Sequence, residues 1–227
     1  MKLLSKLDKY IAEVALELAA VPANRVSEIE RLAESIKSTL RIRDFVNLSF
    51  ICTHNSRRSH IAQVWAGALA VHFGFDEKRI RTFSGGTVIT VPNVRVISGL
   101  RRAGFEVDPI TCSKGPAYLV TFAPDYPPIK LYSKLYDDPS NPKQDFYAII
   151  TCQEANKACP AGIGTDHRSL LKYEDPQRYD DTPLEDIMYD KCIREIGREM
   201  YLLMSKVRVL IPDTRALRTG RGLGKTG

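Results

Sequence analysis

The chain opens with two stretches in which apolar residues recur every three or four positions. Their members are Leu4, Leu7, Ile11, Val14 and Leu18, followed by Ile29, Leu32, Ile36 and Leu40. Such spacing places the apolar side chains on one face of a helix. Pro22 stands between the stretches, and Ser27 with Glu30 has the pattern of a capping box. Residues 1–43 are therefore predicted to form a helical hairpin that packs on the rest of the chain, with dimerisation or shielding of a site as alternatives.

From residue 45 onward, short apolar runs alternate with stretches of helical spacing. Strands are expected near residues 45–51, 118–122, 129–132 and 146–150, and helices after residues 60, 93 and 182. This alternation predicts an α/β fold, with a central parallel sheet, helices on both faces and a ligand at the carboxyl ends of the strands. Residues 44–211 are expected to form one catalytic domain. Residues 212–227, rich in Gly and Arg, are expected to form a basic flexible tail.

Composition narrows the class of protein. No apolar run approaches the roughly 18 residues needed to span a membrane, and the first residues do not resemble a signal peptide. Five cysteines without short spacing argue against a secreted disulfide framework. We therefore expect a cytoplasmic protein without membrane contact. The net charge of +6 favours anionic partners in general, but nucleic acid is not expected. No Cys and His spacing indicates a metal site, and no cofactor is implied.

The candidate chemistry lies directly after the first expected strand, in the segment Cys-Thr-His-Asn-Ser-Arg-Arg-Ser at residues 52–59. A loop between a strand and a helix presents unpaired amide groups at the positive helix end, and these bind tetrahedral anions. The same helix end favours the thiolate of a neighbouring cysteine, here Cys52. Arg58 can grip two anion oxygens, and Ser59 can donate its hydroxyl to the thiolate. The predicted oxyanion-binding residues are Thr53, His54, Asn55, Ser56, Arg57, Arg58 and Ser59.

This segment resembles the loop of low-molecular-weight protein tyrosine phosphatases and of the thioredoxin-coupled arsenate reductases that share their fold. The resemblance extends over roughly residues 45–205, and the Phe-Ser-Gly-Gly sequence at 83–86 is similar to the turn after the second strand of that family. The chain departs from the family pattern at three positions. His54 stands where glycine is usual, Arg57 where many members have a second cysteine, and Gln63 where the reductases often carry a glutamate.

A second pair of cysteines, Cys152 and Cys159, has C-x6-C spacing directly after the expected strand 146–150. This segment is similar to the redox segment of the arsenate reductases. The resemblance implies that Cys52 attacks arsenate, that Cys152 attacks the adduct, and that Cys159 resolves the disulfide, which thioredoxin then reduces. The six intervening residues are polar and are expected to be mobile enough for the sulfurs to meet. Unpaired thiols without a redox role are the alternative.

An acid that protonates a leaving oxygen is the third expected group. The resemblance points to Asp175 of a late Asp-Pro dipeptide, whose proline stiffens the loop. Asp108 and Asp138 also precede prolines, and ordinary turns explain them better.

Arsenate reduction coupled to thioredoxin is the first choice of function. The alternatives are hydrolysis of phosphate monoesters through a Cys52 phosphocysteine, and a noncatalytic phosphate-binding module. An oligomer could form through the N-terminal helices.

Overall fold

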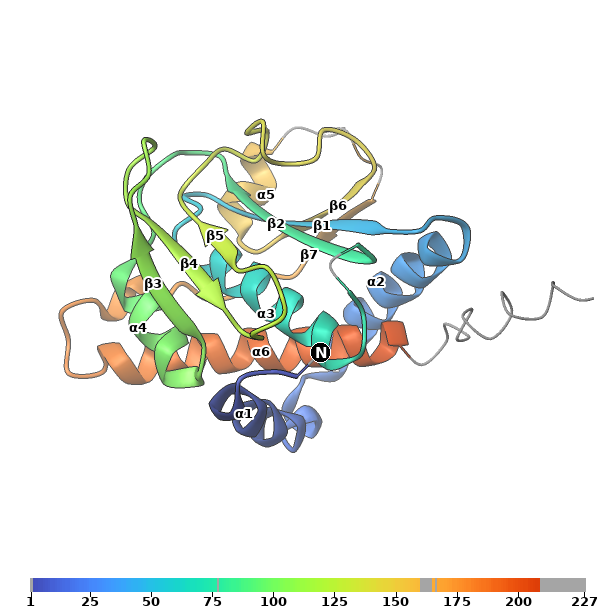
Figure 1. Cartoon of the computed structure of the whole chain (residues 1–227), viewed down its shortest axis with the longest axis horizontal. Helices are drawn as coiled ribbons and strands as arrows, with labels where there is room; N and C mark the ends of the chain where they lie inside the picture. Colours follow the sequence, from blue (N-terminus) through green and yellow to red (C-terminus); the bar gives the residue numbers. More distant parts are fainter. Residues whose placement is uncertain (1, 77, 160–164, 166, 209–227) are drawn as a thin grey trace, which may run out of the picture.

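We describe the protein from a computed structural model, in which residues 2–76, 78–159, 165 and 167–208 are placed well enough to describe. A four-stranded parallel sheet forms its centre (Figure 1). The strands lie in the order β2 (Ile80–Gly86), β1 (Val46–Cys52), β6 (Phe146–Ile150) and β7 (His167–Leu170). Every residue of β1 and β6 is buried, as expected of parallel strands that are covered on both faces.

Helices cover both faces of this sheet, which confirms the predicted fold class. Figure 1 shows α5 (Gln153–Ala158) on one side, and α3 (Arg58–His72) with α6 (Glu185–Arg208) on the other. The Trp65 ring of α3 packs directly on the α6 backbone at Gly197, where a Cβ would lie 2.7 Å from the ring. α4 (Val94–Ala103) ends at Gly104, which adopts the left-handed conformation with φ 104°.

A second, antiparallel sheet of three strands lies beside the first. It contains β3 (Glu106–Ile110), β4 (Ala117–Thr121) and β5 (Ile129–Leu131), in that order. The two expected strands near 118–122 and 129–132 are thus present. The turn expected at Asp108 is wrong, because Asp108 and Pro109 lie within β3. β3 is an edge strand, the position to which prolines within sheets are largely confined.

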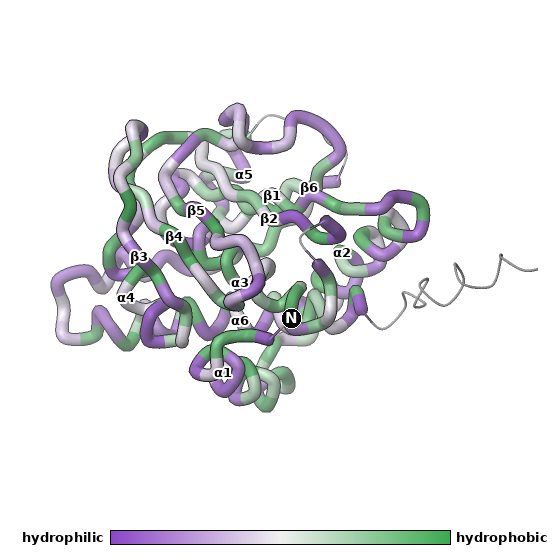
Figure 2. The backbone as a smooth tube through the Cα atoms, in the orientation of Figure 1, coloured by the Kyte–Doolittle hydropathy of each residue, from purple (hydrophilic) through white to green (hydrophobic). Residues whose placement is uncertain are grey.

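The N-terminal residues form α1 (Ser5–Ala15), the short 3₁₀ helix η1 (Leu18–Ala20) and α2 (Ala23–Ile42). Hydrophobic and hydrophilic residues alternate along α1 (Figure 2), and its apolar side chains Leu7, Ile11 and Val14 are buried. The capping box expected at Ser27 is wrong. Ser27 lies inside α2 and donates its hydroxyl to the Ala23 carbonyl at 3.2 Å, because the helix begins directly after Pro22.

Both helices of the hairpin contact α6 of the same chain, so their apolar faces are already covered. The proposed boundary at residue 43 and self-association through these helices remain predictions. Residues 212–227, the expected basic tail, lie outside the described part of the chain. Among the described residues, none of the helices combines the length and apolarity that crossing a membrane requires.

Candidate active site

The segment singled out in the sequence joins β1 to α3. β1 ends at Cys52 and α3 begins at Arg58, so residues 53–57 form the connecting loop. Asn55 adopts a left-handed conformation with φ 44°, which asparagine tolerates better than most residues. His54 is not among the positive-φ residues of the described chain. Its side chain at a position where glycine is usual therefore introduces no left-handed strain.

The polar groups of this loop are divided between two directions. The loop carbonyls accept hydrogen bonds from neighbouring segments. The Thr53 carbonyl accepts from the backbone amides of Thr87 (2.9 Å) and Val88 (2.8 Å), and the Ser56 carbonyl from that of Asn93 (3.1 Å). The His54 carbonyl accepts from the hydroxyls of Ser133 (2.9 Å) and Thr90 (3.0 Å). The backbone amide groups of residues 53–58, in contrast, donate to no acceptor within the described residues. Successive unpaired amides at a helix N-terminus form an anion-binding nest.

Ser59 links the candidate nucleophile to the loop. The Cys52 Sγ lies 3.0 Å from the Ser59 Oγ, and the side-chain amide of Asn55 donates to the same hydroxyl oxygen at 3.0 Å. When Cys52 is a thiolate, only the hydroxyl carries a proton, so Ser59 is then the donor to the sulfur. The Asn55 Oδ1 in turn accepts from the backbone amide of Lys134 at 3.0 Å. The predicted contact between Ser59 and Cys52 is therefore present, and a segment after β5 supports it.

Asp175 lies against both arginines of the loop. It caps the 3₁₀ helix η2 (Pro176–Tyr179), and its two oxygens lie 2.8 Å from the Arg57 Nε and 2.6 Å from an Arg58 Nη. The other Arg58 Nη donates to the Tyr173 carbonyl at 3.1 Å. The Arg58 Nε is buried and has no partner among the described residues, so it is a spare donor. The Arg57 side chain contacts Asp175 and Gln177.

Two cavities open on either side of this arrangement. One of about 610 Å³ is lined by Thr53, Arg58 and residues 172–175, and one of about 420 Å³ by Ser56, Arg57 and residues 90–95. His54 and Gln177 line both of them. The loop is therefore reached from two sides, and each side has room for a group larger than the anion itself.

Cys152 and Cys159 lie close to the loop. Both belong, with Cys52, to one buried cluster at the carboxyl ends of β1 and β6. The Cys152 Sγ lies 3.4 Å from the Thr53 Oγ1. Burial raises the pKa of the Cys159 thiol, and Arg168 opposes this shift. The segment between the two cysteines, whose mobility stays a prediction, forms the helix α5, with the Cys159 amide donating to the Ala155 carbonyl at 2.8 Å.

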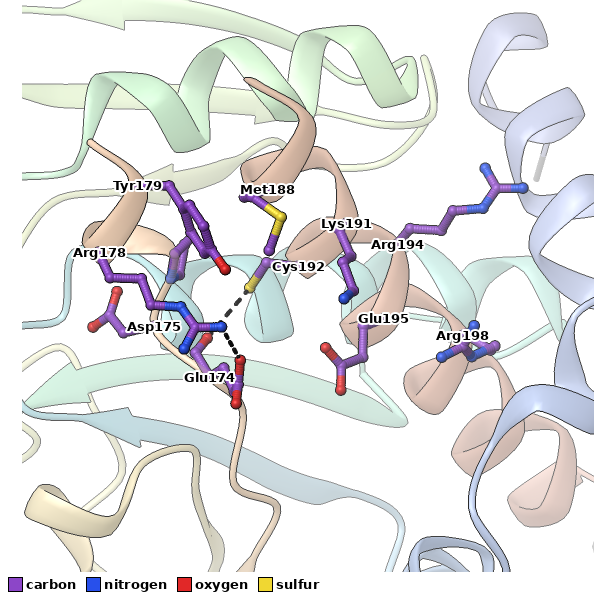
Figure 3. Close-up of a pocket in the computed structure, with 11 residues that line it drawn as sticks. Glu174, Asp175, Arg178, Tyr179, Met188, Lys191, Cys192, Arg194, Glu195 and Arg198 are labelled. Atoms are coloured by element: carbon purple, nitrogen blue, oxygen red, sulfur yellow. Dashed lines mark hydrogen bonds and ion pairs between the residues drawn. The ribbon is translucent and has the colours of Figure 1, made fainter. Parts of the chain in front are cut away.

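The other two cysteines lie elsewhere. Cys192 is at the floor of a separate cavity of about 490 Å³ between η2 and α6, where its Sγ approaches the Glu174 carbonyl (Figure 3). Burial raises the pKa of Cys192 to about 12, so its thiol stays protonated near neutral pH and packs in the core. Cys112 lies between β3 and β4. Asp138 forms a turn and pairs with Lys114, away from the loop.

Several residues that support the loop carry no clear signal in the sequence. The loop is hydrogen-bonded to Thr90, Ser133 and the backbone of Lys134. Only the Gly-Gly pair at 85–86 indicates in the sequence that another segment approaches here. A Cβ on Gly86 would lie 2.7 Å from the Thr53 carbonyl oxygen, so the neighbouring strand requires glycine there. In the described part of the chain, no three His, Cys, Asp or Glu side chains gather as a metal site would require.

Solved structures with the same arrangement of elements are known. One is the arginine phosphatase YwlE of Bacillus subtilis, a cysteine-to-serine mutant with a phosphorylated active-site serine; identity is 12%, coverage is 75% of this chain and 99% of that one, and the TM-score is 0.50. The chain has the fold of that phosphatase. A low-molecular-weight phosphotyrosine phosphatase of Vibrio cholerae is 14% identical, with coverage of 70% and 95% and a TM-score of 0.48.

A thioredoxin-dependent arsenate reductase of Corynebacterium glutamicum is 16% identical, with coverage of 88% and 96% and a TM-score of 0.41. No protein-family model matches the chain, and no curated protein matches it significantly. The match to the arginine phosphatase shows that this chain shares its fold. Identity of 12–16% does not distinguish one reaction from another.

Proposed function

We propose that this protein is a thiol enzyme that reduces arsenate to arsenite through Cys52, Cys152 and Cys159, with thioredoxin as the reductant. The observation that carries the proposal is the buried cluster that contains all three thiols. The anion nest of residues 53–58 and the spare Arg58 donor support oxyanion binding at Cys52. A phosphatase needs only Cys52 and an acid, so two further cysteines beside the loop favour the redox reaction.

The relay balances as three exchanges. The Cys52 thiolate attacks arsenic and displaces a hydroxyl group, which leaves as water after protonation. The Cys152 thiolate then attacks the Cys52 sulfur, and the electrons of the sulfur–arsenic bond leave with arsenic, which is reduced from the +5 to the +3 state and released as arsenite. The Cys159 thiolate attacks the Cys152 sulfur and frees the Cys52 thiolate. Two thiols of thioredoxin reduce the remaining Cys152–Cys159 disulfide.

The last exchange requires α5 to unwind. Cys152 and Cys159 flank this helix of six residues, and a rise of about 1.5 Å per residue would keep their α carbons roughly 10 Å apart. A disulfide needs α carbons within roughly 7 Å. Because isolated helices shorter than about 12 residues are marginal in water, α5 depends on its neighbours and can be lost locally.

Phosphate monoester hydrolysis is the second candidate. The resemblance assigns the acid that protonates the leaving group to Asp175, and its carboxylate lies 2.6 Å from Arg58, beside the proposed anion site. The arginine phosphatase of the same fold carries a phosphorylated active-site serine in place of a cysteine, which parallels a phosphocysteine at Cys52. In this case, Asp175→Asn would lower hydrolysis of p-nitrophenyl phosphate by about 10²- to 10⁴-fold.

The deciding experiment measures arsenate-dependent NADPH oxidation with thioredoxin and thioredoxin reductase. We expect sustained turnover by the wild type, about one event per molecule in Cys159→Ser, and unchanged turnover in Cys112→Ser, the matched control outside the cluster. Arsenate turnover that survives Cys159→Ser would contradict the relay. Hydrolysis of phosphate monoesters without arsenate turnover would favour the phosphatase. Phosphate binding that survives Cys52→Ser, without any turnover by the wild type, would indicate a noncatalytic binding module.

A further inference from the structure

Arg25 of α2 reaches from the N-terminal hairpin to the segment that follows β7. One Nη of its guanidinium donates to the Lys172 carbonyl, and its Nε lies 3.1 Å from the Glu199 carboxylate on α6. The guanidinium carbon lies 5.6 Å from the centroid of the Tyr173 ring. The Arg25 side chain is 16% exposed, and Glu199 and Tyr173 are buried. Arg25 is thus a fixed contact between three elements.

The segment that Arg25 holds also positions Arg58. The carbonyl of Tyr173, next to that of Lys172, accepts from an Arg58 Nη at 3.1 Å. Asp175, two residues further on, accepts from the other Nη at 2.6 Å. Arg25 and Arg58 therefore bind neighbouring carbonyls of one strand-like segment. The two contacts on the Arg58 fork decide where its buried Nε points.

Charge explains why Arg25 is needed at this place. Burial raises the pKa of Glu199, and Arg25 is the foremost group that opposes the shift. A buried carboxylate without a cation is strongly destabilising, so Glu199, together with Glu28 at 2.9 Å from an Nη, holds the guanidinium in place. The guanidinium fork has further N–H groups, and one of them is thereby directed at the Lys172 carbonyl.

We propose that Arg25 is a positioning residue of the oxyanion site, which acts through the Lys172 and Tyr173 carbonyls to set the orientation of Arg58. The N-terminal hairpin then contributes to anion binding, besides its packing on α6. The inference rests on the proposed oxyanion site at Cys52 and Arg58, and it holds whether the bound anion is reduced or hydrolysed.

The hairpin also offers a matched control. Glu30 lies on α2, five residues after Arg25, and pairs with Lys206 of α6 at 2.6 Å. Both side chains of that pair are 43–46% exposed, and neither lines the two cavities beside the loop. Glu30→Gln therefore removes a contact between hairpin and α6 without touching residues 171–175.

The test measures binding of inorganic phosphate by isothermal titration calorimetry, well below the unfolding temperature of each variant. Arg25→Met combined with Glu199→Gln removes both charges and leaves no buried charge unpaired. We expect its dissociation constant for phosphate to rise about tenfold or more, and that of Glu30→Gln to match the wild type. Arg25→Lys keeps a cation beside Glu199 but lacks the second nitrogen that donates to the Lys172 carbonyl. We expect the dissociation constant of this variant for phosphate to rise at least about threefold.

Steady-state kinetics provides a readout that loss of stability alone would not produce. We expect the KM for the oxyanion to rise in the Arg25 variants in parallel with the dissociation constant, with a smaller change in kcat. Unchanged phosphate affinity in the double variant would overturn the inference and leave the hairpin a packing role. If the double variant does not fold, wild-type affinity in Arg25→Lys would overturn it equally. A wild type that binds neither phosphate nor arsenate would instead contradict the proposed function.

Discussion

The contact between Cys52 and Ser59 determines how reactive the candidate nucleophile is. A hydrogen bond to a charged group contributes roughly 1.5–3 kcal/mol, and 1.4 kcal/mol corresponds to a factor of about ten. Ser59 Oγ lies 3.0 Å from the sulfur, and the side-chain amide of Asn55 donates to the same hydroxyl. We therefore predict that Ser59→Ala slows alkylation of Cys52 by iodoacetamide at pH 7 about tenfold, because the thiolate loses its donor.

Ser56→Ala is the control for this prediction. The Ser56 hydroxyl lies in the same loop but donates to the Val91 carbonyl at 2.6 Å, away from the sulfur. Alkylation of Cys52 should therefore proceed at the wild-type rate in that variant. Equal rates in Ser59→Ala and the wild type would show that the helix N-terminus alone stabilises the thiolate.

A second residue behind the loop makes the stability depend on pH. His60 is fully buried in the first turn of α3, and burial, followed by the charge of Lys134, lowers its pKa to about 3. Between the ordinary value of 6.5 and about 3, the unfolded chain binds a proton that the folded chain does not. This residue therefore makes the folded state less stable as the pH falls through that window.

We predict that, in His60→Gln, the free energy of unfolding falls less steeply with decreasing pH, by up to about 1.4 kcal/mol per pH unit. The measurement is urea unfolding at intervals between pH 7 and pH 4. His167→Gln is the matched control, because it makes the same substitution at a histidine that is exposed. If the dependence of the free energy of unfolding on pH were the same in both variants as in the wild type, His60 would take up a proton in the folded protein.

At the scale of elements, the sequence was informative where structure is local. Cys52, Arg58 and Ser59 lie within eight residues, so the apolar run before them and the helical spacing after them suffice to predict the strand, the loop and the helix. The partners of the loop are far away in the chain. Ser133 is 79 residues from His54, and no periodicity indicates that contact.

α5 shows why the remaining elements escape such reasoning. Its residues are polar and have no apolar stripe, so the sequence predicts no helix there. The helix exists because other elements hold it: Arg168 of β7 donates to the Asn156 carbonyl at 2.7 Å and to the Cys159 carbonyl at 3.1 Å. Tertiary contacts of this kind override weak local preferences. The start of α2 also differs from the prediction, since the helix begins at Ala23 and not at the capping box expected at Ser27.

The same contacts predict that Arg168 controls the stability of α5. In Arg168→Ala, α5 loses donors to carbonyls at its C-terminal end, so it should unwind more readily. We expect hydrogen exchange of the Cys159 amide, which donates to Ala155, to accelerate at least about tenfold, and the Cys152–Cys159 disulfide to form faster with diamide. Lys157→Ala is the control, since this side chain is exposed on α5. Unchanged exchange in Arg168→Ala would show that α5 is stable without this clamp.

At the scale of the whole molecule, the hairpin and the sheet share one hydrophobic core. Side chains of α1 and α2 belong to the same buried cluster as those of β1, α3 and α6. The backbone is also joined, because the Leu4 amide donates to the Phe122 carbonyl at 2.9 Å. Trp65 of α3 stacks on Tyr10 of α1, with centroids 5.9 Å apart. The packing gives no reason for the hairpin to unfold before the core.

We therefore predict a single unfolding transition that a mutation in the hairpin shifts as a whole. Leu7→Ala removes a side chain that is 0% exposed and should lower the free energy of unfolding by about 2–5 kcal/mol. Urea titrations followed by Trp65 fluorescence and by far-ultraviolet circular dichroism should move together. Leu16→Ala makes the same substitution at a side chain that is 86% exposed, and it should change neither curve. If the fluorescence transition moved while most of the helical signal remained, the hairpin would be a separate folding unit, and its contact with the active-site segment through Arg25 would be open to regulation by local unfolding.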